Sequence, residues 1–119
     1  MLTIRKDQII ILGKYTWQNF LKRALIHLHE DLNNYVVDFT DTQLCNRIAR
    51  VTVLAESYGL KDEYDIICFL DAGFLLKDEQ FHKNTKFAPI CSILEDNRLD
   101  SGDKAEQILT LAVQQLLVV

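Results

Sequence analysis

Two histidines and two carboxylates occur close together in the first third of the chain, and their types could hold a metal ion. They are His27, His29, Glu30 and Asp31. Residues two apart on a helix point about 200° apart, so His27 and His29 cannot bind the same ion. His27 and Asp31 share a helix face, but zinc needs further ligands and no His-Glu-x-x-His pattern is present. We therefore predict a solvated helix end here, without a metal site.

Two aspartates in the apolar segment near residue 70 could act as an acid and a base. Asp65 and Asp71 are six residues apart, which places them on nearly opposite sides of a helix. They therefore do not form a paired-carboxylate site. Asp71 follows the apolar run Ile-Ile-Cys-Phe-Leu, so we expect it to be partly buried. Its predicted ion-pair partners are Arg47, Arg50 and Lys104.

The remaining candidate nucleophiles are cysteines and serines. Cys45, Cys68 and Cys91 are widely spaced, odd in number and not arranged as Cys-x-x-Cys. Each lies within an apolar helical pattern, which predicts reduced, buried thiols that pack as small hydrophobes. No serine lies in a nucleophile-elbow context, and no glycine-rich phosphate loop is present. The sequence thus predicts no catalytic residue, no cofactor and no metal.

Helical periodicity predicts the elements that position these side chains. After a short extended entry at Leu2–Ile4, an amphipathic helix should run from about Arg5 to Asn33-Asn34, where asparagine tolerates a left-handed cap. Tyr35–Phe39 is β-branched and aromatic and could be a short strand. Since no second strand is available to pair with it, we favour an extended linker.

Local signals predict the start and the end of a second helix. Thr40 and Gln43 match a capping box, in which each side chain bonds the backbone amide of the other residue. Gly59 should end this helix in the left-handed conformation.

The second half of the chain predicts three more helices. One starts near Lys61-Asp62 and is apolar on most of its circumference, so it should be central, with Gly73 allowing another helix to approach. A polar loop at Lys77–Lys86 follows. The only proline then opens a short helix at about Ala88–Leu94, and Asp100 caps the last helix.

Composition limits the fold class and the class of partner. With 4 glycines and 1 proline in 119 residues, the chain predicts an all-α fold, a compact bundle of four to five helices forming a single helical domain over residues 1–119. The net charge of −4, spread along the chain, argues against a nucleic-acid or membrane partner. Without a signal sequence or a long apolar run, we expect a cytoplasmic protein.

One large apolar residue stands within the polar loop and marks the predicted partner-binding site. Phe81 is either a core residue or an anchor for a partner protein surrounded by charged groups. The predicted partner-binding residues are Phe81, His82, Asp78, Glu79 and Lys83. The last helix is a rival surface, because its Leu-Leu-Val-Val end is more apolar than one face can bury, and it could form a homodimer.

An ordered set of hydrophobic and turn residues covers nearly the whole chain. These are Met-Leu-Thr-Ile-Arg at the start, Tyr58-Gly59-Leu60, Glu63, Asp65-Ile66, Phe69-Leu70-Asp71, Phe74-Leu75, Phe81, Ile93-Leu94, Asp96, Leu99 and Lys104. In this order they resemble a family of small bacterial proteins encoded beside type VI secretion genes, near PAAR-type spikes and their effectors. The chain departs from that pattern at Lys61, Gly73, Lys86-Phe87 and Gly102.

The resemblance implies a non-enzymatic, protein-binding role in contact-dependent bacterial competition. The leading hypothesis is an adaptor or chaperone for a spike or effector protein of a type VI secretion gene cluster. The alternative is an immunity protein that binds and neutralises a cognate secreted toxin. An acidic inhibitor commonly meets a basic active site, which is compatible with the negative net charge.

Overall fold

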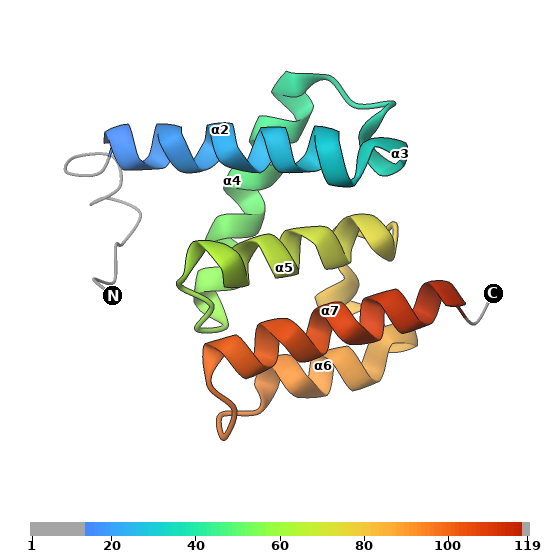
Figure 1. The fold of residues 1–119 in the computed structure, drawn as a ribbon. Helices are drawn as coiled ribbons and strands as arrows, with labels where there is room; N and C mark the ends of the chain where they lie inside the picture. The colour runs from blue at the N-terminus through green and yellow to red at the C-terminus, as the bar shows by residue number, and fades with distance from the viewer. Residues whose placement is uncertain (1–13, 118–119) are drawn as a thin grey trace. The chain divides into compact units, whose positions relative to one another are not determined.

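The computed structural model describes residues 14–117, and within this range all regular secondary structure is helical (Figure 1). The elements are α2 (Lys14–Asp31), α3 (Asn33–Val36), α4 (Asp41–Ser57), α5 (Glu63–Leu75), the 3₁₀ turns η1 (Phe81–Lys83) and η2 (Thr85–Phe87), α6 (Ala88–Glu95) and α7 (Ser101–Leu117). The predicted all-α fold with about five helices is confirmed. The predicted extended entry at Leu2–Ile4 and the predicted helix start near Arg5 lie outside the described residues.

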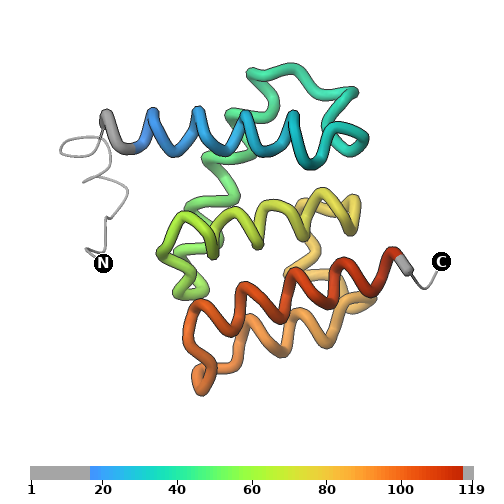
Figure 2. The backbone as a smooth tube through the Cα atoms, in the orientation of Figure 1, coloured from blue at the N-terminus to red at the C-terminus, as the bar shows by residue number. Residues whose placement is uncertain are grey.

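The chain divides into two units, Met1–Val53 and Leu54–Val119, and the boundary falls inside α4. The described part of the first unit holds α2, α3 and most of α4. The second holds the end of α4, then α5, the two 3₁₀ turns, α6 and α7, as the backbone trace in Figure 2 shows. The single domain expected over residues 1–119 stays a prediction.

In the first unit, α2 buries one stripe of side chains and packs against α3. Phe20, Ala24, Leu28 and Leu32 recur every four residues and are at most 6% exposed. This spacing keeps their side chains on one face of the helix, as the sequence pattern predicted. The same face leads directly into α3.

The segment Tyr35–Phe39 is not the extended linker that the sequence predicted. Its first two residues belong to α3, and the backbone amides of Tyr35 and Phe39 donate to the carbonyls of Leu32 and Val36. These short-range bonds turn the chain tightly, which lets Val36 reach the core at 1% exposure. The predicted left-handed cap at Asn33-Asn34 is also wrong, since Lys77 is the non-glycine residue with positive φ in the described range.

Helix α4 begins at the predicted capping box. The Thr40 hydroxyl accepts a hydrogen bond from the Gln43 amide at 3.1 Å, and the Gln43 side-chain oxygen accepts one from the Thr40 amide at 2.9 Å. Two amide donors that a helix start leaves unpaired are thus satisfied. This confirms a start signal that four consecutive residues carry without help from the rest of the fold.

Helix α4 ends in a Schellman motif at Gly59, which has a φ of +86°. The amide of Leu60 donates to the Ala55 carbonyl and the amide of Gly59 donates to the Glu56 carbonyl, each at 3.0 Å. An L-residue at this φ brings its Cβ close to its own carbonyl, which costs about 1–2 kcal/mol. The prediction of a left-handed Gly59 is confirmed.

Two glycine substitutions should therefore change the stability in opposite directions. We expect Gly59→Ala to lower the free energy of unfolding by about 1–2 kcal/mol through backbone strain alone, because its added Cβ would meet no atom within 4 Å. Gly102→Ala, in the first turn of α7, should instead raise it by about 0.4–1 kcal/mol, since its Cβ would contact Asp100 at an ordinary 3.6 Å. Urea unfolding of both variants measures the difference, and equal effects would refute this account of Gly59.

The second unit is built around α5, which packs against α7, while α7 also packs against α6 (Figure 1). Nine of the thirteen residues of α5 are buried, Gly73 among them, which confirms that this helix is apolar on most of its circumference. Helix α6 has its proline in the first turn, as predicted. The Asp100 carboxylate accepts the Asp103 amide at 2.8 Å, which confirms the predicted N-cap of α7.

Candidate functional site

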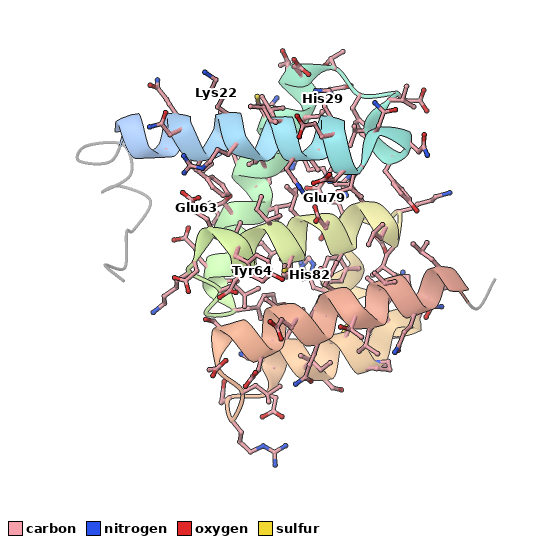
Figure 3. All side chains as sticks on the ribbon, viewed as in Figure 1. Lys22, His29, Glu63, Tyr64, Glu79 and His82 are labelled. Carbon is pink, nitrogen blue, oxygen red and sulfur yellow. The ribbon has the colours of Figure 1, made fainter. Side chains whose placement is uncertain are left out.

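The histidine cluster of α2 does not gather around one point. His27 Nδ1 lies 2.8 Å from Asp31 Oδ2, and His29 Nε2 lies 2.8 Å from Asp41 Oδ1 at the start of α4. Each histidine thus has its own aspartate (His29 is labelled in Figure 3). Across residues 14–117, no group of three or more His, Cys, Asp or Glu side chains is arranged to hold a metal ion.

The two aspartates of α5 are both buried. Asp71 is 8% exposed, so its predicted burial is confirmed, and Asp65 is 3% exposed. Asp65 Oδ2 accepts no hydrogen bond from the described residues. The ammonium of Lys104, one predicted partner of Asp71, donates to the carbonyls of Tyr58 at 3.3 Å and Leu94 at 3.1 Å.

The predicted partner-binding loop is folded into two 3₁₀ turns and carries Phe81 into the core of the second unit. Phe81 is 1% exposed, and its ring centroid lies 4.9 Å from that of Phe69 on α5. The Asp78 carboxylate accepts hydrogen bonds from the Gln80 amide and from the Asn84 side chain, each at 2.9 Å. These bonds close the loop upon itself and hold the backbone around Phe81.

His82 is buried beside Phe81 and is 8% exposed. Its ring lies edge-on to the rings of Tyr58 and Phe81, with ring centroids 6.1 Å and 6.3 Å apart. Nδ1 of His82 is buried and has no hydrogen-bond partner among the described residues. Burial lowers the pKa of His82, the positive charge of Lys83 lowers it further, and Asp78 opposes both. The ring is therefore an apolar packing element at neutral pH.

The three cysteines are free thiols. Cys68 is buried, as predicted, whereas Cys45 and Cys91 are half-buried. Cys91 Sγ lies 3.2 Å from the His82 carbonyl oxygen and 3.6 Å from that of Phe81. Burial raises the pKa of both Cys68 and Cys91. A raised pKa keeps a thiol protonated at neutral pH and therefore unreactive as a nucleophile.

The sequence left two interpretations of Phe81 open, a core residue and an anchor for a partner protein. Both Phe81 and His82 are buried, so Phe81 is a core residue in this structure, the first of the two alternatives. Asp78 and Glu79 are half-buried, and Lys83 is exposed. Binding of a partner through this loop stays a prediction, and it would require the loop to open.

A different surface combines an exposed aromatic ring with a carboxylate, and sequence reasoning missed it. Tyr64, in the first turn of α5, is 61% exposed (Figure 3). The Cys68 thiol raises the pKa of the Tyr64 hydroxyl most, and the negative charges of Glu106 and Asp65 raise it further. Glu106 is exposed on α7, the helix that packs against α5. We call the exposed residues Tyr64 and Glu106 the Tyr64 surface.

The charge of the chain is unevenly divided between the units. Residues 54–119 carry 12 acidic and 6 basic side chains, a net charge of −6, whereas residues 1–53 carry a net charge of +2. The sequence had been interpreted as evenly charged, and that interpretation is wrong. The Tyr64 surface belongs to the acidic unit. A count of charges on either side of Val53 could have found this asymmetry.

The helices were also compared with the requirements for crossing a membrane, and the chain with known proteins. None of the helices within residues 14–117 combines the length and the apolar character needed to cross a bilayer. Comparisons with protein-family models, with curated proteins and with solved structures find no match to this chain.

Proposed function

We propose that this chain is a non-enzymatic protein-binding module, an adaptor or chaperone for a spike or effector protein of a type VI secretion gene cluster. The type of gene cluster follows from the sequence resemblance alone. The observation that carries the binding role is the Tyr64 surface, which combines an exposed tyrosine of α5 with an exposed carboxylate of the adjoining helix α7. Tyrosine is enriched among residues that dominate binding energy.

The chemistry of this surface indicates the charge of the partner. Glu106, the carboxylate of the Tyr64 surface on α7, is exposed and therefore accessible to a partner. A net charge of −6 on the same unit steers a basic protein toward it. The raised pKa values of Cys68 and Cys91 support a role without nucleophilic catalysis.

The charge asymmetry also favours a second candidate, an immunity protein that neutralises a secreted toxin. Toxins that act on nucleic acids or other polyanions carry basic active sites, and an acidic inhibitor meets these by charge complementarity. The neighbouring genes distinguish the two roles. A toxin gene directly upstream supports immunity, and a spike gene without a toxin supports an adaptor. Either role uses the same acidic surface.

We expect Tyr64→Ala to weaken binding of the protein encoded by the neighbouring gene by about 2 kcal/mol or more, roughly 30-fold in Kd. Isothermal titration calorimetry with the purified pair measures this. Raising the ionic strength should weaken binding as well, because the attraction depends on surface charge. Val113→Ala is the matched control, since Val113 is an exposed apolar residue of the same unit at 42% exposure. Equal affinity of the two variants would contradict the role of the Tyr64 surface.

A further inference from the structure

Loop 77–87, the segment from Lys77 to Phe87, encloses the imidazole ring of His82. If this ring took up a second proton, the new N–H would have no hydrogen-bond acceptor among the described residues. A neutral imidazole carries one N–H, but the protonated ring carries N–H groups on both nitrogens. Nδ1 of His82 is buried, and the described residues offer it no hydrogen-bond partner. Protonation would thus place a donor and a positive charge among the rings of Tyr58 and Phe81. Burying such an unpaired group is costly.

The first residue of the loop is strained, and part of what holds the loop closed is weak. Lys77 has a φ of +57°, a left-handed conformation that costs a non-glycine residue about 1–2 kcal/mol. Among the contacts that oppose opening are the two hydrogen bonds to Asp78, the burial of Phe81 and Phe87, and the hydrogen bonds of the Cys91 thiol. Thiols are weak hydrogen-bond donors. Protonation of His82 can therefore shift the equilibrium between the closed and the open loop.

We infer that loop 77–87 is an acid-sensitive switch, in which protonation of His82 opens the loop and brings Phe81 to the surface. This inference does not depend on the proposed function. If the two hold together, the open loop adds an apolar contact for a partner at low pH. The open state also explains how Phe81, a core residue in the closed state, could take part in binding.

The groups around His82 determine the sign and the range of the pH effect. Within the loop, the charge of Lys83 disfavours protonation of His82 and the charge of Asp78 favours it. Outside the loop, the titratable groups next to His82 are Tyr58, which follows α4, and Cys91 of α6, while Glu95 of α6 acts on the pKa of Tyr58. The open loop should titrate near the ordinary His value of 6.5. Because the pKa of the closed form is lower, closure is fully favoured above this pH. It weakens as the pH falls through 6.5 toward the closed-state pKa.

Hydrogen–deuterium exchange of the full chain at about pH 7.5 and about pH 5.5 tests this inference, after correction for the intrinsic pH dependence of exchange. We expect exchange in peptides covering residues 77–87 to rise several-fold on acidification, with α7 unchanged. Absence of a rise in these peptides would overturn the inference.

Substitution of the histidine separates its titration from a general effect of acid. His82→Phe keeps an aromatic ring of similar size but cannot be protonated, so the rise should disappear. His82→Gln serves if the phenylalanine variant misfolds, which circular dichroism would show. His29→Gln is the control, because His29 belongs to the first unit and should leave the rise intact. A rise that persists in both His82 variants would contradict the switch.

Discussion

Replacing Phe81 by alanine is expected to lower the free energy of unfolding by about 3–5 kcal/mol, the range for a buried phenylalanine. The side chain is 1% exposed and packs on Phe69 with ring centroids 4.9 Å apart. Truncation would therefore leave a cavity between loop 77–87 and α5. For a chain of this size the thermal midpoint should fall by about 10 °C or more. Thermal and urea unfolding followed by circular dichroism measure both quantities.

A neighbouring surface residue provides the matched control. Lys83 lies two residues away in the same 3₁₀ turn and is exposed, so Lys83→Ala should change stability by at most about 0.5 kcal/mol. If Phe81→Ala leaves the thermal midpoint unchanged and weakens partner binding instead, the closed loop is not the dominant state in solution. The original hypothesis of an exposed anchor would then be restored.

Lys104→Ala should destabilise the second unit by about 2–4 kcal/mol, because its charged hydrogen bonds would be lost together with buried side-chain volume. Lys104 is 7% exposed, and its ammonium bonds the carbonyls of Tyr58, after the end of α4, and Leu94, in the last turn of α6. A cation at the carboxyl ends of two helices also compensates their partial negative charge. Chemical denaturation of the variant measures the loss.

A second substitution separates the ammonium from the alkyl chain of Lys104. Lys104→Met keeps an unbranched apolar side chain but cannot donate to either carbonyl, so it should retain most of the loss seen with alanine. The opposite result, a methionine variant as stable as the wild type, would mean that packing alone explains the effect. The carbonyls of Tyr58 and Leu94 would then not depend on the lysine.

Features set by a few neighbouring residues could be predicted from the sequence. The capping box of Thr40 and Gln43, the left-handed Gly59 and the N-cap at Asp100 each depend on hydrogen bonds within a single turn. Their physical cause is local, so their signals survive whatever the rest of the chain does. The helices they delimit were therefore placed almost correctly.

Features set by contacts between distant residues could not be predicted. Phe81 has polar neighbours in sequence, yet it is buried because η1 packs against α6 and its ring meets Phe69. The exposed Tyr64 lies within an apolar helix, and the exposed Glu106 of the same surface comes from α7. Such pairs become visible only when the helices are placed in space. The candidate site was thus assigned to the loop, whereas the exposed aromatic ring lies on α5.

The most direct test of the central claim is the hydrogen-exchange footprint of the chain at neutral pH, with and without the protein encoded by its neighbouring gene. The claim is that the Tyr64 surface binds this partner. The expected result is slower exchange in peptides covering residues 62–68 and 101–108, with loop 77–87 unchanged. Slower exchange confined to loop 77–87, with the Tyr64 surface unaffected, would contradict the claim and return the binding site to Phe81.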